Sequence, residues 1–343
     1  MKRYVVPVAA ASALVLSAAG GALAAPAPKS LVPVVSPQVS ALFGALRGLP
    51  HPAPPHEPAP PARPQPRPQH HLRITTLSIY EHSAQPWILS AQGCRAARRH
   101  ENGVVVLDFG KPAFHHGGYG TTLFSGRFAP NHKITRAMGS YASGYARCLP
   151  SGSTAYIALA RGTSNYHPAV PSAYAAGVRW ARETNALGHR LERKGLADHV
   201  EAAAADDAEP AWDRDFRKTR EFFHGFRAAV HGHTLYDYGS LDGGIGAVWS
   251  ARQAWYVAGG LRHTEALPEI YNYAMAREWA DLARIARARY HLAVHFAGVM
   301  TERTASCNCG FRPADAHRVL AHALAVHGLG HIPLPVGGTN IMG

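Results

Sequence analysis

The chain has 343 residues, with 35 Lys and Arg, 22 Asp and Glu, 22 His and 4 Cys. A charged fraction of 17% and a hydrophobic fraction of 47% exclude both a disordered polymer and a polytopic membrane protein. The length is sufficient for one large domain or two modest ones, each with a sizeable core.

Residues 1–24 have the features of a signal peptide. Lys2 and Arg3 precede an uncharged apolar run to about residue 19, and Ala22-Leu23-Ala24 is a small-x-small cleavage site. The run is short for a membrane span and two prolines follow it, which favours cleavage over an uncleaved anchor. We therefore expect a secreted, extracellular protein with no transmembrane domain in the mature chain.

Residues 25–71 are predicted to be a disordered, proline-rich linker. Ten of the nineteen residues at 50–68 are proline, which is incompatible with a helix or a central strand. Such a segment adopts polyproline II and extends by about 3.1 Å per residue. We expect it to hold the folded domain, residues 72–343, away from the membrane or cell wall.

The charge balance points to anionic partners. Without Lys2 and Arg3 the mature chain keeps 33 basic residues against 22 acidic ones, a formal charge of +11 with histidine neutral. A basic exported protein meets anionic cell-wall polymers, so association with the wall is expected. Nucleic acid is not expected as a partner, because no basic run is interleaved with aromatic residues in a recognisable module.

From residue 72 onward, predicted strands and helices alternate. Residues 104–110 are a continuous apolar run that ends in Asp108 and Gly110, typical of a strand buried on both faces. The predicted strands are 74–80, 104–110, 154–160, 199–206, 234–238, 267–271, 292–299 and 332–336. The predicted helices are 132–147, 171–194, 215–229, 248–259, 274–290 and 313–327.

This alternation predicts an α/β fold built on a parallel sheet, with right-handed crossovers between the strands. A block of 272 residues is close to the usual size of a (β/α)8 TIM-like barrel, which is the fold we expect. An open doubly wound sheet is the competing architecture. It is disfavoured because no G-x-G-x-x-G turn follows any of the strands.

Four cysteines in an exported protein are expected to form disulfides. Three pairings are possible. Cys94–Cys148 together with Cys307–Cys309 is favoured, because the other two pairings require both members of the tight Cys-Asn-Cys to reach distant partners.

Acidic and aromatic residues collect where four predicted strands end. In a parallel barrel these carboxyl ends meet at one side, where active sites lie. The catalytic candidates are Asp108, Asp207 and Glu209, and the substrate-binding candidates are Trp212, Tyr236, Tyr238, Glu269, Tyr271 and Asn272.

Close carboxylates raise one another's proton affinity, so one can stay protonated while its partner is ionised. Strand alternation places Asp207 and Glu209 on one face and Asp206 on the other. One protonated and one ionised carboxyl group are the requirement for glycoside hydrolysis, and aromatic rings at the same edge provide surfaces for stacking sugars. The sequence therefore predicts acid/base catalysis on a polysaccharide.

Three features of this pattern resemble the family-25 lysozymes (muramidases) and related glycoside-hydrolase-like barrels of exported bacterial proteins. They are Asp108 at the end of a first strand, Asp207-x-Glu209 at a middle strand, and the Tyr-x-Tyr-Gly-Ser strand end at 236–240. The resemblance implies a cleft for the glycan chain of peptidoglycan. It also implies that Glu209 is the general acid, Asp207 its partner and Asp108 a residue that shapes the site.

Two alternatives remain open. The first is a barrel that binds carbohydrate or cell wall without cleaving it, since a fold does not establish a function. The second is a zinc-dependent hydrolase that uses His231 and His233 with Asp237, or His115 and His116. No H-E-x-x-H motif is present, so no metal site and no cofactor are expected.

Overall fold

The computed structural model describes residues 74–303 and 310–342, all of which belong to one compact unit, Arg67–Gly343. The expected signal peptide, the linker and the proposed Cys307–Cys309 disulfide lie outside the described residues. None of the helices in the described part combines the length and the apolar composition that crossing a membrane requires.

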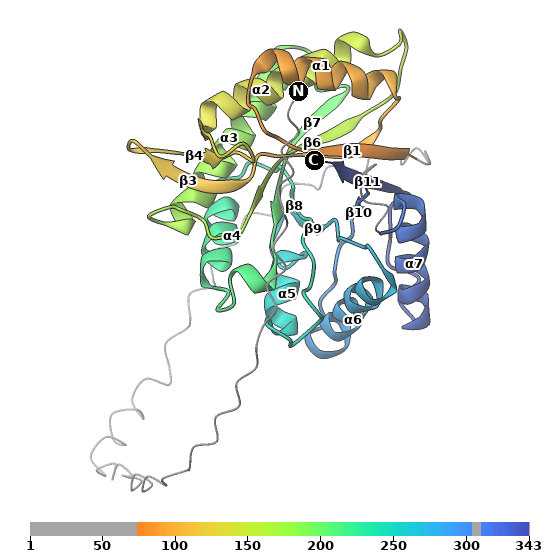
Figure 1. Ribbon diagram of the computed structural model, residues 1–343. Helices are drawn as coiled ribbons and strands as arrows, with labels where there is room; N and C mark the ends of the chain where they lie inside the picture. The colour runs from red at the N-terminus through yellow and green to blue at the C-terminus, as the bar shows by residue number, and fades with distance from the viewer. Residues whose placement is uncertain (1–73, 304–309, 343) are drawn as a thin grey trace, which may run out of the picture. The chain divides into compact units, whose positions relative to one another are not determined.

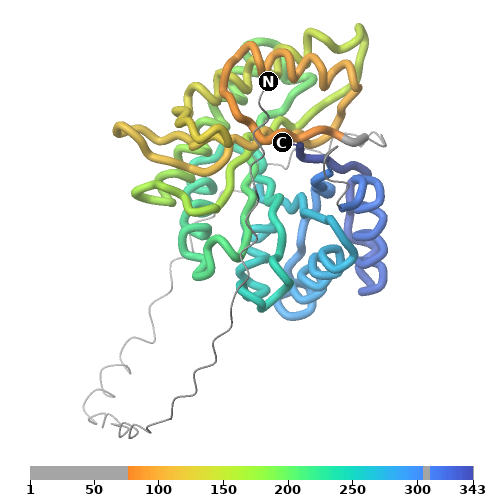
Figure 2. The backbone as a smooth tube through the Cα atoms, in the orientation of Figure 1, coloured from red at the N-terminus to blue at the C-terminus, as the bar shows by residue number. Residues whose placement is uncertain are grey.

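Eight parallel strands form a barrel, as the alternating pattern predicted. In spatial order they are β10 (Val299–Glu302), β11 (Gly337–Met342), β1 (Ile74–Tyr80), β2 (Gly103–Asp108), β6 (Ile157–Ser164), β7 (Val200–Asp207), β8 (Leu235–Asp237) and β9 (Thr264–Ala266). The first and last strands of the chain lie side by side (Figure 2). Two isolated parallel bridges, Ala266 to Phe296 and Glu269 to Met300, join the β9 side to the β10 side and close the sheet.

Helices cover the outside of the barrel (Figure 1). They are α1 (Pro86–Arg98), α2 (Asn131–Cys148), α3 (Ala173–Arg193), α4 (Arg217–Ala229), α5 (Ala251–Val257), α6 (Tyr273–Tyr290) and α7 (Pro313–Val326). Helix α3 illustrates why they form: Ser172 caps its N-terminus by accepting from the Ala175 N–H at 3.1 Å. Its buried residues, such as Ala176 and Trp180, recur every three or four positions and face the sheet.

A small antiparallel sheet, which the sequence pattern did not predict, lies between β2 and α2. It consists of β3 (Lys111–His115), β4 (Gly118–Thr122) and β5 (Phe128–Pro130), and β3 and β4 project away from the barrel (Figure 1). The Phe114 N–H donates to the Ala169 carbonyl at 2.9 Å, which ties β3 to the loop after β6. Because this sheet follows β2, it stands at the end of the barrel where the strands terminate.

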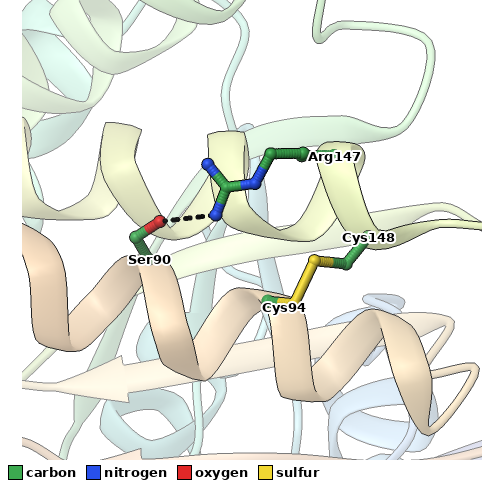
Figure 3. The surroundings of a disulfide bond; sticks show 4 residues. All are labelled: Ser90, Cys94, Arg147 and Cys148. Carbon is green, nitrogen blue, oxygen red and sulfur yellow. Dashed lines mark hydrogen bonds between the residues drawn. A yellow bond between two sulfur atoms is a disulfide. The ribbon is translucent and has the colours of Figure 1, made fainter.

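Helices α1 and α2 pack backbone against backbone. A Cβ on Gly93 would lie 2.1 Å from the Tyr141 carbonyl oxygen, and one on Gly144 would lie 2.0 Å from that of Ser90. The Cys94–Cys148 disulfide joins the same two helices, so this predicted pairing is confirmed (Figure 3). The pair of glycines and the disulfide together fix the spacing of α1 and α2.

Several boundaries differ from those predicted, for identifiable reasons. Strand β6 continues to Ser164 rather than ending at residue 160, because Arg161 is buried in the strand with its guanidinium 3.8 Å from the Trp180 ring centroid. Strand β11 begins at Gly337 instead of residue 332, because Pro333 and Pro335 have no N–H to donate to a strand ladder.

Strands β9 and β10 are also displaced from the predicted ranges. Strand β9 ends at Ala266, and the predicted segment 267–271 contains Pro268, which interrupts the ladder. Strand β10 begins only at Val299, after a loop in which His291 and His295 are exposed. Helix α1 was not predicted, although Pro86 at its first turn is a common signal for a helix start.

Candidate active site

Six carboxyl groups lie at the end of the barrel where the parallel strands terminate. Five of them are buried, with exposed fractions between 1% and 7%, and only the Glu209 side chain is half-buried. They are Asp108 at the end of β2, Asp206 and Asp207 at the end of β7, Asp237 at the end of β8, Glu209 just after β7, and Glu269 after β9.

Strand alternation divides these groups between the barrel interior and the helix layer. The apolar interior is formed by Val106, Ala160, Ala203, Ala205, Tyr236, Tyr238, Leu267, Met300 and Ile341. Two residues beyond Val106, Ala205 and Leu267 come Asp108, Asp207 and Glu269, which therefore lie above this apolar group. Asp206 instead lines a small cavity with Phe222 of α4, so the sequence-based separation of Asp206 from Asp207 is confirmed.

Asp207 is at the centre of the interior group. Burial raises its pKa well above the usual range, and the negative charges of Glu269, Glu209 and Asp108 raise it further. Its Oδ1 has no hydrogen-bond partner among the described residues. A carboxyl group in these surroundings binds a proton more readily than one exposed to water, and it competes for that proton with the neighbouring carboxyl groups.

The position of Glu209 is fixed by hydrogen bonds to its backbone and to its carboxyl group. The Asn165 side chain accepts from the Glu209 N–H at 3.1 Å and donates to the Glu209 carbonyl at 2.9 Å. The Ser240 hydroxyl donates to Glu209 Oε1 at 2.9 Å and also lies 3.0 Å from Asp242 Oδ1. Burial and the charge of Asp242 raise the pKa of Glu209, and the bond from Ser240 opposes them. Glu209 is thus an oriented, partly accessible carboxyl group with an increased proton affinity.

The remaining interior carboxyl groups titrate near neutrality. Burial raises the pKa of Asp108 to about 7, against the lowering effect of the Gly110 N–H, which donates to it at 2.8 Å. Burial also raises the pKa of Glu269 to about 8, and Tyr271, which hydrogen-bonds to it, lowers it. No ion pair between described residues includes any of these carboxylates, so no cation is paired with them there.

The predicted aromatic residues lie in different environments. Tyr236 and Tyr238 are 6% and 0% exposed and belong to the barrel interior, so neither presents a ring face to solvent. Trp212 is half-buried in the short helix η2 (Pro210–Trp212), with its ring centroid 5.3 Å from that of the exposed Tyr166. The accessible aromatic surface at this end of the barrel is therefore formed by Trp212 and Tyr166 rather than by the strand tyrosines.

Two further candidates have local structural contacts. Tyr271 is partly buried beside Glu269, and its burial together with the charge of Glu269 raises its pKa. Asn272 is exposed, and its side chain caps α6 by accepting from the Ala274 and Met275 N–H groups at 2.8 and 3.1 Å.

Sequence reasoning missed several residues that the fold brings to this end. Asn165 lay beyond the predicted end of its strand, and Ser240 was named only as the last residue of the motif at 236–240, with no role of its own. Tyr80 ends β1, and burial together with Glu302, Glu269 and Asp207 raises its pKa. Only their positions could have identified these residues from the sequence, because each lies at or just beyond the carboxyl end of a barrel strand.

The histidines of the zinc hypothesis are not brought together. His231 and His233 precede β8, whereas Asp237 ends it, so they lie at opposite ends of that strand. His115 ends β3 and His116 follows in the turn to β4, with their rings edge to face and their centroids 4.0 Å apart. Across residues 74–303 and 310–342, no three His, Cys, Asp or Glu side chains are placed to hold a metal ion.

Comparison with known proteins adds little to this description. The sequence matches no protein-family model, and it matches no curated protein. Among solved structures, the chain is similar to a GH18 chitinase from Pseudoalteromonas aurantia, with 10% identity and a TM-score of 0.38 over 78% of this chain and 94% of that chain. A likeness this remote supports no statement about activity. The fold and the site define a (β/α)8 barrel with a buried cluster of carboxyl groups at its C-terminal end.

Proposed function

We propose that this protein is an exported enzyme that hydrolyses glycosidic bonds in a polysaccharide. Glu209 acts as the general acid, Asp207 is its carboxylate partner, and Asp108 shapes the site. The observation that supports this proposal is the interior group formed by Asp108, Asp207, Glu209 and Glu269, which are mutually repelling and unpaired with any described cation.

The repulsion supplies the two protonation states that the reaction needs. When Asp207 and Glu269 compete for protons with Glu209, at least one group stays protonated near pH 7 while another is ionised. The proton of Glu209 passes to the glycosidic oxygen as the bond from the anomeric carbon to that oxygen breaks. The ionised partner stabilises the positive charge that develops on the sugar, and water then adds its hydroxyl to the anomeric carbon and its proton to a carboxylate.

Two contacts orient the acid. Asn165 holds the Glu209 backbone through both its N–H and its carbonyl, and Ser240 contacts the carboxyl group itself. Asn165 is in turn held by Thr219, to whose hydroxyl it donates at 3.0 Å. Acid catalysis requires this kind of positioning, because proton transfer depends on a fixed distance between the donor and the leaving oxygen.

The finer proposal is that the polysaccharide is peptidoglycan. It rests on the predicted signal peptide, the basic character of the mature chain and the resemblance of Asp108 and Asp207-x-Glu209 to the family-25 lysozymes. Trp212 and Tyr166 provide the aromatic surface beside Glu209 on which a sugar ring would stack.

A second candidate is a barrel that binds glycans without cleaving them. Carboxyl groups with raised pKa values, such as that of Glu269, are neutral at pH 7 and can donate hydrogen bonds to sugar hydroxyls. Arginine pairs to both Asp207 and Glu209 would favour this candidate, since they would hold these groups ionised. No such pair is present between described residues, which favours the hydrolase.

The test is the release of reducing ends from purified peptidoglycan and from a panel of other glycans by the full mature chain. Glu209→Gln is expected to lower the rate at least a hundredfold, because it removes the proton donor. The matched control is Glu265→Gln, which changes another substantially buried glutamate, on β9. Circular dichroism establishes that both variants are folded.

Other outcomes discriminate between the candidates. Full activity of Glu209→Gln would overturn the assignment of the acid. No release from any glycan, together with pelleting on cell walls that Trp212→Ala weakens, would establish the binding protein. The absence of both glycan cleavage and cell-wall binding would contradict the proposal of a carbohydrate ligand.

A further inference from the structure

The N-terminal end of the barrel, opposite to the carboxyl groups, is rich in basic side chains. Seven loops lead from a helix into a barrel strand, and six of them contain histidine. One representative of each is His100, His199, His231, His263, His291 and His331. Because all the barrel strands are parallel, these loops meet at the same end.

A surface pocket of about 500 Å³ lies among these loops, between the end of α6, the loop into β10 and the loop into β11. Its ionisable lining residues are Arg287, His291, His295 and His331. The remaining lining residues are alanine, leucine, valine, isoleucine and proline, so the lining contains no carboxyl group.

The ionisable side chains that line the pocket are all basic, and they can donate hydrogen bonds to a ligand. Arg287 makes a short contact with His331 Nε2, which joins the α6 side to the β11 side. The backbone carbonyls nearby are already used: that of Ala293 accepts from Trp255 Nε1 at 2.9 Å, and that of His295 accepts from the Ala266 N–H at 2.7 Å. At least these two carbonyl oxygens are therefore not free to repel an anion that enters the pocket.

The partial negative charge at the C-terminus of α6 is reduced by hydrogen bonds to its carbonyl groups. The carbonyls of Ala286 and Arg287 accept from the N–H groups of Leu292 and His291 at 3.1 and 3.2 Å, so these two acceptors at the end of α6 are satisfied. Asp281, an acid on α6, is not a lining residue. It lies 2.9 Å from Arg284 and 3.6 Å from His327.

We propose that this pocket binds a phosphate group, as a phosphomonoester or as one link of a phosphodiester polymer. The planar guanidinium of Arg287 can donate two parallel hydrogen bonds to a phosphate, and imidazole N–H groups provide the rest of the shell. Under this proposal, the pocket is where an anionic cell-wall polymer would bind. The pocket is separate from the carboxyl groups, so it does not depend on the proposed hydrolysis.

The experiment is titration calorimetry of the full mature chain with two probes, inorganic phosphate and a short poly(glycerol phosphate). A carboxylate polymer of similar length, polyglutamate, serves as the third ligand. Arg287→Gln combined with His331→Gln is expected to weaken binding of the phosphate probes at least tenfold. The matched control is Arg289→Gln, an exposed arginine of the same helix that does not line the pocket.

Each outcome decides the matter. Binding of inorganic phosphate identifies a single-phosphate site, and binding of the polymer alone identifies a phosphodiester chain. No binding of either probe overturns the proposal. Equal loss in the control variant, or equal binding of polyglutamate, also overturns it, because general surface charge would then explain the affinity. Unchanged far-ultraviolet circular dichroism establishes that the double variant, altered at two exposed side chains, remains folded.

Discussion

The two ends of the barrel differ in both the sign and the burial of their charges. At the C-terminal end, carboxyl groups such as Asp108 and Asp207 are almost inaccessible. At the N-terminal end, basic side chains such as Arg287 and His331 are exposed. One parallel sheet carries both, because loops after strands and loops after helices emerge on opposite sides.

The difference in burial gives the two ends different chemistry. Buried acids that repel one another have shifted proton affinities, which suits proton transfer. Exposed basic groups remain hydrated and suit the reversible recognition of an anion. The candidate site is thus a group of buried acids in a chain whose formal charge is positive.

Replacement of Asp207 by asparagine should have the largest effect on the C-terminal end. We expect the hydrolytic rate to fall about a thousandfold, since the partner of the general acid is lost. Phosphate binding at the N-terminal end should be unchanged. The matched control is Asp206→Asn, which alters the neighbouring acid on the helix side of the same strand. A similar loss of rate in both variants would show that the interior position of Asp207 is not what matters.

The buried acids should also make stability depend on pH. Burial raises the pKa of Asp108 to about 7 and those of Asp237 and Glu269 to about 8, above their values of about 4 in an unfolded chain. Between these limits the native state holds protons that the unfolded chain releases. The free energy of unfolding therefore falls as pH rises from about 4 to about 8, by up to about 1.4 kcal/mol per pH unit for each such group.

Urea unfolding at pH 5, 6, 7 and 8 measures this dependence. Asp237→Asn removes one of these groups from the titration, so its curve of unfolding free energy against pH should be flatter than that of the parent chain. A free energy of unfolding that rises over this range would show that the acids are ionised in the native state.

Ionic strength should affect ligand binding differently at the two ends, and this effect should be smaller than those of the substitutions and of pH. We expect the affinity for a phosphate polymer to fall about fivefold between roughly 50 and 500 mM salt, because exposed charges are screened. Binding of a neutral glycan at the C-terminal end should change less than twofold, since stacking on Trp212 involves no charge. Equal salt dependence at the two ends, measured by calorimetry, would contradict this division of roles.

The barrel could be predicted from the sequence because its periodicity is strong. Continuous apolar runs that end in acidic residues predicted strands such as β2 and β7. Strand β1, Ile74–Tyr80, has the predicted bounds. The antiparallel sheet at 111–130 was not predicted, because its strands have only three to five residues and show no clear alternation of apolar and polar side chains. The second half of β6 was not predicted because Arg161 interrupts the apolar run. Its burial depends on two distant partners, the ring of Trp180 and the side-chain oxygen of Asn131, to which it donates at 2.7 Å.

The candidate site divides in the same way. The acids Asp108, Asp207 and Glu209 could be named in advance, because each follows an apolar strand. Asn165 could not, because its role comes from a pairing with the Glu209 backbone, 44 residues away in sequence. The burial of Tyr236 depends on which face of a three-residue strand points inward, and so short a strand does not define that face.

The closure of the barrel between β9 and β10 has a consequence for the acids. Strands β6 and β7 are paired over eight residues, whereas the closing side has only the bridges from Ala266 to Phe296 and from Glu269 to Met300. Glu269 thus forms part of a weakly bonded seam, and its charge opposes that of Asp207. We expect ionisation of these two carboxyl groups to weaken the seam through charge repulsion, and protonation to strengthen it. Local opening of the barrel on this side would then be linked to proton uptake and release at the site.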